Sequence, residues 1–211
     1  PDEKQFNHNP EKSDRVRIGW LGGSSHLADL QILNGMVGKL SDLKDKIQFV
    51  LCGFDTRGSI TELNQETKQE RTRAIKPMES VWYQYEQIFT GDYKIVGEDQ
   101  KKELHKFDFG VEYGDSNTPY RRVWTKPITT YASNYNKFDI SLAPLKPHLF
   151  NQVKSQLKVI EAGFHKKALI AQNYGPYQID CVHALNKGGG FNPKGNSLLV
   201  DTHKNHKQWY Q

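Results

Sequence analysis

The chain has 211 residues, of which 36% are hydrophobic and 11% aromatic. This length and composition exclude an intrinsically disordered chain and suit a globular domain with a substantial core. No apolar run approaches the roughly 18 residues of a membrane-spanning helix, and we expect no signal peptide.

The net charge is +5 and the isoelectric point about 9.0. This charge suits phosphate-bearing partners or an anionic membrane face. Because basic and acidic residues are interspersed and no nucleic-acid motif occurs, we expect no nucleic-acid partner. The chain has two cysteines, Cys52 and Cys181, so we expect no disulfide framework. We therefore expect the protein to be cytoplasmic, where it could lie at the inner face of the membrane.

The first part of the chain predicts a strand–helix–strand unit. Residues 15–22 (RVRIGWLG) and 47–53 (IQFVLCG) are two apolar runs typical of buried strands. Between them, residues 26–39 predict a helix, for which Ser24 or Ser25 is the expected N-cap. Its apolar face consists of Leu27, Leu30, Leu33, Val37 and Leu40. The two strands are therefore expected to be parallel, joined by a right-handed crossover.

The middle of the chain carries weaker patterns. Residues 59–72 are polar and compatible with a helix, and residues 79–89 (ESVWYQYEQIF) predict an aromatic-faced helix. A short strand and a charged helix are expected within 91–109. Residues 122–124 predict an interior strand and residues 129–136 a helix.

A second strand–helix–strand unit follows. Residues 138–144 (FDISLAP) and 167–172 (KALIAQ) predict strands, and residues 152–163 predict the helix between them, with Gly163 as its C-cap. Residues 173–177 (NYGPY) predict a tight turn.

The last part predicts a short helix over 180–186, a mobile glycine-rich loop over 186–196, a strand over 197–201 and the start of a helix over 203–211. The alternation of strands and helices predicts the α/β class, with a Rossmann-like open parallel sheet and helices on both faces.

The helix predicted over 152–163 carries two stripes. Lys154, Lys158 and Glu161 are spaced i, i+4, i+7 and form the polar stripe. A second stripe is expected to pack on the sheet and consists of Val153, Leu157, Ile160 and Phe164. One interpretation of the polar stripe is a solvated edge with a Lys158–Glu161 pair. The other is a ligand site.

The position of this helix favours a ligand. In an open parallel sheet, ligands bind beyond the carboxyl ends of the strands. Lys154 and Ser155 are expected in the first turn of the helix that follows such a strand. A lysine there is unfavourable beside the positive end of the helix dipole, and a bound anion such as phosphate would offset this. Glu161, two turns on, could accept hydrogen bonds from a diol such as a ribose.

Two further loops are expected at the same edge of the sheet. Gly22, Gly23 and Ser24 follow the first strand, and glycines let a backbone approach a ligand closely. The turn whose centre is Tyr174 to Tyr177 follows the second βαβ unit. Each loop alone is equally well an ordinary turn, so the prediction depends on their convergence.

At this point the sequence resembles a known family. FDISLAPL, then FN..KS.LK.IEAG, ALIA...GPY and GNSLLV with Trp209 resemble the C-terminal half of a GT-B glycosyltransferase of the retaining group 1 type. RIGWLGGSSHLADL resembles the first strand and glycine loop of that half. The resemblance covers residues 15–43 and 137–209, about half of the chain, and its ordered series is specific although no single piece is.

The resemblance implies an organisation. Such enzymes have two Rossmann-like domains across a cleft, of which the C-terminal one binds the nucleotide-sugar donor and the N-terminal one the acceptor, without a metal. It implies that residues 1–14 are a linker and residues 15–211 the donor domain, with a divergent segment over about 55–120. The acceptor domain is then missing from this sequence, so this piece is expected to be inactive alone.

The resemblance also implies site residues. Gly22 and Gly23 would lie near the donor phosphates, Glu161 would hold the ribose hydroxyls, and the loop around Lys154 and Ser155 would lie at the sugar or diphosphate. No catalytic residue is assigned. The complete set expected to bind the nucleotide sugar is Gly22, Gly23, Ser24, His26, Lys154, Ser155, Lys158, Glu161, Tyr174, Gly175 and Tyr177.

Two departures from the family pattern bear on the function. Val153 stands where many members carry a second glutamate, and GGSSHLADLQIL lacks the Arg and Lys that often clamp the diphosphate. Lys154, Lys158 and His26 are the candidates for that cationic role. The implied activity is transfer of a hexose from a nucleotide diphosphate sugar to a hydroxyl of a glycan or lipid-linked acceptor, as in polysaccharide biosynthesis. The alternative is a non-catalytic nucleotide- or partner-binding domain of the same fold.

Three other signals are weaker. A zinc site could draw on Cys181, His183, Asp201, His203 and His206, but this spacing matches no strong pattern. Aromatic residues of the 79–89 helix could stack on sugars, although core packing or contact with a missing domain is favoured. A dinucleotide oxidoreductase would need G-x-G-x-x-G, and the first strand offers only Gly19 and the Gly22–Gly23 pair.

Overall fold

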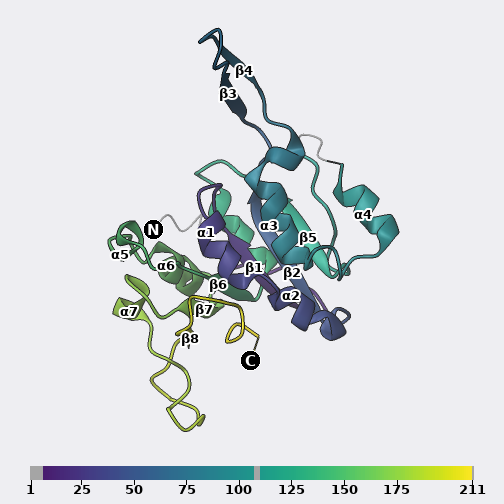
Figure 1. Ribbon diagram of the computed structural model, residues 1–211. Helices are drawn as coiled ribbons and strands as arrows, with labels where there is room; N and C mark the ends of the chain where they lie inside the picture. The colour runs from purple at the N-terminus through teal and green to yellow at the C-terminus, as the bar shows by residue number, and fades with distance from the viewer. Residues whose placement is uncertain (1–6, 107–109, 211) are drawn as a thin grey trace.

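A computed structural model describes residues 7–106 and 110–210. Its centre is a six-stranded sheet in the order β5-β2-β1-β6-β7-β8, in which all neighbouring strands are parallel (Figure 1). The strands are β1 (Val16–Leu21), β2 (Ile47–Phe54), β5 (Tyr120–Trp124), β6 (Ile140–Ala143), β7 (Ala168–Gln172) and β8 (Leu198–Val200). Taken in chain order, this is the arrangement of a doubly wound fold, whose order reverses between β1 and β6. The predicted Rossmann-like sheet is confirmed.

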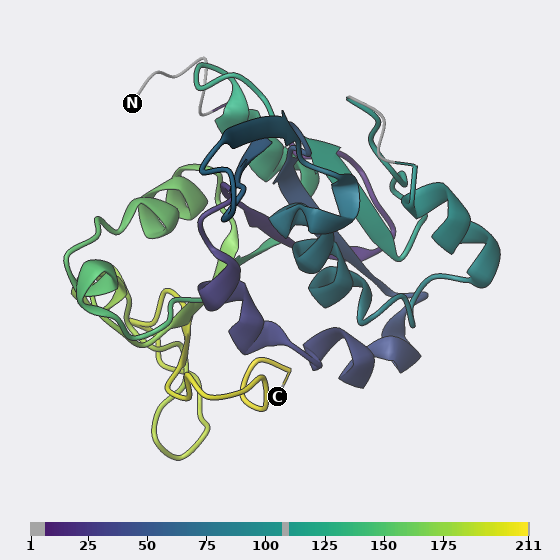
Figure 2. The same ribbon diagram turned by 45° about the horizontal axis from the view of Figure 1, so that its top comes forward.

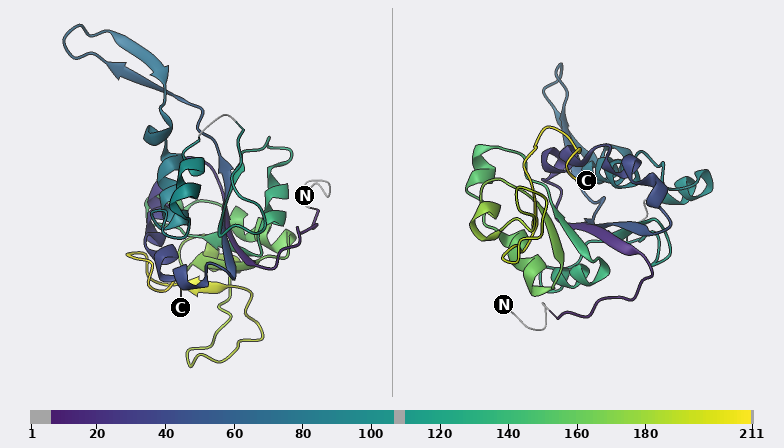
Figure 3. Two further views of the ribbon diagram at one scale, coloured as in Figure 1. Left: turned by 90° about the vertical axis from the view of Figure 1, so that its right-hand side faces the viewer. Right: turned by 90° about the horizontal axis from the view of Figure 1, so that it is seen from below.

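Helices cover both faces of this sheet, as Figure 3 (left) shows. One face carries α1 (Leu27–Leu30), α2 (Met36–Lys39) and α3 (Val81–Thr90), with α4 (Glu98–Leu104) further out. The other face carries a 3-10 helix, η4 (Tyr131–Lys137), and α6 (Leu157–Phe164). Shorter elements are the helices α5 (Leu149–Gln152) and α7 (Tyr177–Asp180) and the 3-10 helices η1 (Gln31–Leu33), η2 (Ser41–Leu43) and η3 (Pro77–Glu79).

The face under α1, α2 and α3 holds an aromatic core. Trp20, Phe54, Trp82 and Tyr85 are almost fully buried there, and the Trp82 and Tyr85 rings lie 5.1 Å apart at a steep angle. Aromatic pairs in this edge-to-face arrangement stabilise a core beyond the area that they bury. The predicted helix over 79–89 is therefore confirmed, and its aromatic residues Trp82 and Tyr85 serve the core.

A buried ion pair lies in the same half of the molecule. Glu86 on α3 and Arg122 on β5 are at most 1% exposed, and a guanidinium nitrogen of Arg122 lies 3.2 Å from the Glu86 carboxylate. The Tyr120 hydroxyl donates to the same carboxylate over 3.0 Å. Burial raises the pKa of Glu86 to about 7, against the opposing effect of Arg122 and Tyr120.

The helix predicted over 26–39 is interrupted. It is divided into α1, η1 and α2, with the break at Asn34 and Gly35, where Gly35 has a φ of +91°. A Cβ at Gly35 would lie 2.7 Å from the His206 ring, so the chain passes too close for a side chain there. The predicted apolar face is nevertheless correct, because Leu30, Leu33 and Val37 are fully buried.

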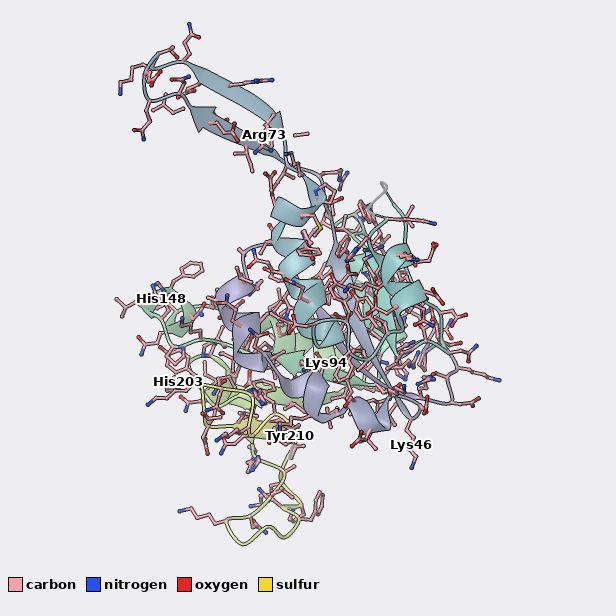
Figure 4. All side chains as sticks on the ribbon, turned by 45° about the vertical axis from the view of Figure 1, so that its right-hand side comes forward. Lys46, Arg73, Lys94, His148, His203 and Tyr210 are labelled. Carbon is pink, nitrogen blue, oxygen red and sulfur yellow. The ribbon has the colours of Figure 1, made fainter. Side chains whose placement is uncertain are left out.

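The helix considered for residues 59–72 is wrong. This segment contains an antiparallel hairpin, β3 (Ser59–Leu63) with β4 (Glu70–Ala74), that projects from the carboxyl end of the sheet (Figure 1). Its turn depends on Asn64, whose side-chain oxygen accepts hydrogen bonds from two backbone N–H groups. At its base, Arg73 binds Glu62 and Glu79 (Figure 4).

The helix predicted over 152–163 also differs. It divides into α5 and α6, and α6 continues past the expected C-cap Gly163 to Phe164. Its expected inner face points outward, since Val153 is 81%, Leu157 50% and Ile160 41% exposed, and Phe164 is exposed as well. The buried side instead consists of Glu161, Ala162 and His165.

The ends of the chain contain less helix than predicted. Residues 181–186 lie in a loop after α7, and residues 203–210 form turns that bring Trp209 into the core.

Two other predicted segments also differ from the structure or extend beyond it. The short strand expected within 91–109 is not formed by residues 91–106. Residues 7–14 contain no helix or strand, and there Glu11 binds Arg121 and Lys137. Residues 1–6 of the predicted linker lie outside the described residues.

Candidate functional site

A cavity of about 480 Å³ opens at the carboxyl ends of β1, β2 and β5. Its walls come from Gly22 and Gly23 after β1, from the segment after β5, from η4 and from the start of α6. Figure 2 turns this end of the sheet toward the viewer. The sheet order reverses between β1 and β6, the strands that precede the glycine loop and the α5–α6 segment. This is the place where doubly wound folds bind their ligands.

The glycine loop after β1 is held in place by its neighbours. Gly53 has a φ of +97°, and a Cβ on it would lie 2.3 Å from the Gly22 carbonyl oxygen. The Tyr85 hydroxyl accepts a hydrogen bond from the His26 N–H over 2.8 Å and donates to the Ser24 carbonyl over 2.9 Å. Burial raises the pKa of Tyr85 to about 12, so this hydroxyl remains a donor at neutral pH.

Lys158 places a cation at the cavity. Its ammonium donates to the Leu21 carbonyl at the end of β1 and lies 5.3 Å from the centre of the Trp20 ring. Burial lowers its pKa. The Lys158–Glu161 pair considered as a solvated edge is not formed, because Glu161 is turned to other partners. The ammonium is thus near the glycine loop and without an ion-pair partner among residues 7–106 and 110–210.

Glu161 lies in the cavity wall and is only 3% exposed. One of its carboxylate oxygens accepts from the Tyr131 hydroxyl and the other from the Tyr135 hydroxyl, the latter over 2.8 Å. Burial and this carboxylate together raise the pKa of both tyrosines. Each oxygen keeps a second lone pair, so Glu161 can hold a ligand hydroxyl beside Tyr131.

Lys154 and Ser155 do not lie in this cavity. Both residues are in the break between α5 and α6 and not in a first helical turn. Ser155 is exposed, and Lys154 borders a separate hollow of about 340 Å³ with its ammonium 5.0 Å from the Phe150 ring centre. Of the two lysines expected to take the cationic role at the diphosphate, Lys158 lines the 480 Å³ cavity and Lys154 does not.

His26 is the N-cap of α1, in place of Ser24 or Ser25, and its ring nitrogen lies 2.9 Å from the carboxylate of Asp29. Burial alone would raise the pKa of Asp29, but the hydrogen bonds from His26 and from the Lys146 N–H lower it. Ser24 lines a third hollow, of about 580 Å³, which shares Gly22 and Gly23 with the first cavity.

The turn after β7 lies apart from the cavity. The Tyr174 hydroxyl is 3.4 Å from the His148 carbonyl, and Gly175 has a φ of +57° where its backbone approaches Asn151. Tyr177 is 5% exposed and packs in the second core cluster, with Ala162 among its members. The turn therefore supports the α5 segment, and Tyr177 serves the core.

Several residues at the cavity were not singled out by the sequence. Tyr131 and Asn134 on η4 line it, as do Lys126 and Ile128 from the segment after β5. The predicted helix over 129–136 was the available signal, since tyrosines at i and i+4 share a face. Their pairing with a glutamate some thirty positions later could not be inferred without the sheet order.

Other kinds of site are not apparent in the part of the chain that the structure describes. Over residues 7–106 and 110–210, no three His, Cys, Asp or Glu side chains lie close enough together to bind a metal ion. In the same residues no helix is both long and apolar enough to cross a membrane. Cys52 and Cys181 are buried and free.

Comparison with known proteins rests on structure. No protein-family model and no curated protein matches the sequence. The catalytic domain of starch synthase IV from Arabidopsis thaliana, bound to ADP and acarbose, matches 99% of this chain with a TM-score of 0.50 and 14% identity. Anabaena Alr3699/HepE, in complex with UDP and glucose, matches 93% with a TM-score of 0.49 and 12% identity. The chain spans 31% and 37% of these two chains, respectively.

The similarity to the starch synthase shows the fold. The chain has the Rossmann-like α/β fold of one half of a GT-B glycosyltransferase, as the sequence resemblance implied. The identity is too low to carry an activity or a ligand from these proteins to this one.

Proposed function

We propose that the chain is the donor-binding domain of a glycosyltransferase that takes a sugar from a nucleotide diphosphate sugar. One observation carries this proposal: the glycine loop of Gly22 and Gly23, the Lys158 ammonium and the Glu161 carboxylate line one cavity at the carboxyl end of the sheet. These groups match, in order, a diphosphate, its negative charge and a ribose.

The chemistry expected of the site is electrostatic. When the sugar leaves, negative charge grows on the diphosphate, and preorganised donors stabilise such charge. Lys158 would supply this stabilisation from its fixed place beside Leu21. Lys154, at the separate hollow of about 340 Å³, would lie toward the sugar, as would His26, whose ring contacts Asp29 in the lining of that hollow. The fold similarity to a starch synthase whose structure holds ADP supports a nucleoside diphosphate as the ligand.

The finer assignments are part of the same proposal. The full protein would transfer a hexose to a glycan or lipid-linked hydroxyl in polysaccharide biosynthesis, without a metal, in the cytoplasm. The acceptor domain would belong to another part of the same protein. A non-catalytic nucleotide-binding domain is the second candidate, because Val153, at the place of the family's sugar-contacting glutamate, is 81% exposed and carries no polar group. Turnover by the full-length protein discriminates between the two.

Peripheral membrane association is supported by the surface of α5 and α6. Leu149, Phe150, Val153 and Phe164 are exposed there, close to the cations Lys154 and Lys166. Apolar side chains with lysines suit an anionic membrane surface. Co-sedimentation with vesicles containing anionic lipid tests this, and binding equal to that of neutral vesicles would contradict it.

The direct test is calorimetric titration with UDP, GDP and ADP. We expect saturable binding of one nucleotide with a Kd in the micromolar to millimolar range, as the three groups at the cavity predict. Lys158→Ala should weaken it about tenfold or more, equivalent to about 1.4 kcal/mol. Lys102→Ala, at an exposed position on α4, is the matched control and should leave the Kd unchanged. Failure of the wild-type protein to bind any of the three would overturn the proposal.

A further inference from the structure

Asn134 on η4 carries a buried side chain without a partner. The residue is fully buried and lines the 480 Å³ cavity. Neither its carboxamide nitrogen nor its carboxamide oxygen has a hydrogen-bond partner among residues 7–106 and 110–210. An unpaired buried polar group costs about 1–3 kcal/mol, and native proteins pair nearly all such groups with protein or water. The partners of Asn134 should therefore come from the cavity.

The other polar residues of η4 have partners within the protein. Tyr131 and Tyr135 donate to Glu161, and the carboxamide of Asn136 bonds the backbone of Asn7 and Asn9. Side chains at i and i+3 of a 3-10 helix lie one above the other. Tyr131 and Asn134 therefore share the side of η4 that lines the cavity. Asn134 differs from these neighbours because its carboxamide has no hydrogen-bond partner within the described ranges.

We propose that Asn134 reads the hydrogen-bonding edge of the nucleobase of the bound nucleotide. This inference rests on the proposed function and assigns a base-recognition residue within its site. A carboxamide presents a donor beside an acceptor, which matches an adjacent donor and acceptor on a base, such as N3–H and O4 of uracil or N6–H and N1 of adenine. A phosphate, which has acceptors alone, does not match both atoms.

The surroundings of Asn134 fit a base next to a ribose. Tyr131 lies three positions before Asn134 on η4, and its hydroxyl donates to Glu161 on α6. Both residues line the cavity and suit ribose hydroxyls. Ile128, an apolar residue that is 80% exposed, lines the same cavity. The glycine loop and Lys158 lie at the β1 end, where the diphosphate would lie. Base, ribose and diphosphate thus find their groups within one cavity.

The test is a thermodynamic cycle between the protein and the base. Once titration has identified the preferred nucleotide, the wild-type protein and Asn134→Ala are titrated with it and with its edge-methylated analogue: N3-methyl-UDP, N1-methyl-GDP or N6,N6-dimethyl-ADP. We expect Asn134→Ala to bind the natural nucleotide at least tenfold more weakly. Methylation should weaken binding to the wild-type protein by a similar factor and binding to the variant by much less, since both changes remove one interaction.

Two controls separate base recognition from a structural role. Asn136→Ala, on the same helix but turned to the N-terminal segment, should keep the wild-type Kd. Asn134→Ala should keep or raise the thermal midpoint, because it removes an unpaired amide, whereas a structural asparagine would lower it. A lowered midpoint, an unchanged Kd or an unchanged penalty for methylation overturns the inference and leaves the proposed function standing. A wild-type protein that binds no nucleotide overturns both.

Discussion

The two halves of the sheet use their apolar and charged residues in opposite ways. The half formed by β5, β2 and β1 buries its aromatic residues under α1 to α3, together with the Glu86–Arg122 pair. The half formed by β6, β7 and β8 has α6 beside it, which buries Glu161 and His165 and exposes Ile160 and Phe164.

This difference indicates a division of labour. The first half holds the glycine loop in place through Tyr85 and acts as a scaffold. The second half supplies charged groups to the cavity and offers an apolar outer surface. Substitutions in the first half should therefore change stability, and those in the second half should change binding with little change in stability.

The largest expected effect is that of Arg122→Ala in the scaffold. The substitution leaves Glu86 buried without its cation. It also removes the hydrogen bonds that the Arg122 guanidinium donates to the Leu104 and Lys106 carbonyls. Removal of one member of a buried pair typically costs about 3–5 kcal/mol, which urea unfolding would measure. Replacing both residues, by Glu86→Leu with Arg122→Met, should recover much of the loss. If Arg122→Ala is as stable as the wild type, the first half of the sheet does not act as the scaffold that the comparison requires.

Glu86 should also make the scaffold sensitive to pH. Its pKa is 4.5 when exposed and about 7 when folded, so between these values the folded state binds more protons than the unfolded state. Its contribution to stability is therefore present below about pH 4.5, is lost as the pH rises to about 7, and changes by about 1.4 kcal/mol for each pKa unit. Glu86→Gln should flatten the dependence of unfolding free energy on pH in this window. An unchanged slope would show that Glu86 stays ionised.

Tyr85→Phe tests whether the scaffold positions the glycine loop for binding. It removes the hydroxyl that bonds the His26 N–H and the Ser24 carbonyl but keeps the buried ring. We expect a loss of about 1 kcal/mol in the free energy of unfolding, and a several-fold rise in the nucleotide Kd because the glycine loop is less fixed. Tyr113→Phe, away from this loop, is the control. A lower stability with an unchanged Kd would separate the loop from the binding site.

The smallest effect on stability is expected at α6. Ile160→Ser removes an apolar side chain that is 41% exposed, so the free energy of unfolding should change by no more than about 0.5 kcal/mol. Leu33→Ala, in the buried scaffold, should cost about 2–5 kcal/mol. Chemical denaturation of both variants makes the comparison, and a large loss for Ile160→Ser would mean that the outer face of α6 is covered.

The sequence predicted the parts whose pattern is local. Apolar runs bounded by glycine and proline correctly placed β1, β2, β6, β7 and β8, and the 3.6-residue period correctly grouped Leu30, Leu33 and Val37. The hairpin was missed because its strands are short and polar, and its turn depends on the side chain of Asn64. A period shows which residues share a face, but a polar exposed hairpin has no apolar period to show.

The tertiary structure decided which face of α6 points inward. Its sequence shows that Leu157, Ile160 and Phe164 share one side, and the hydrophobic effect alone would bury that side. The opposite outcome arises because Tyr131 and Tyr135 bond Glu161 and the Tyr135 ring stacks on His165, 5.0 Å away. A buried polar group is tolerated where partners satisfy it. Those partners come from η4, a separate element that only the folded sheet brings beside α6. For the same reason, the sequence could not show that the carboxamide of Asn134 lines the cavity and has no partner in the part of the chain that the structure describes.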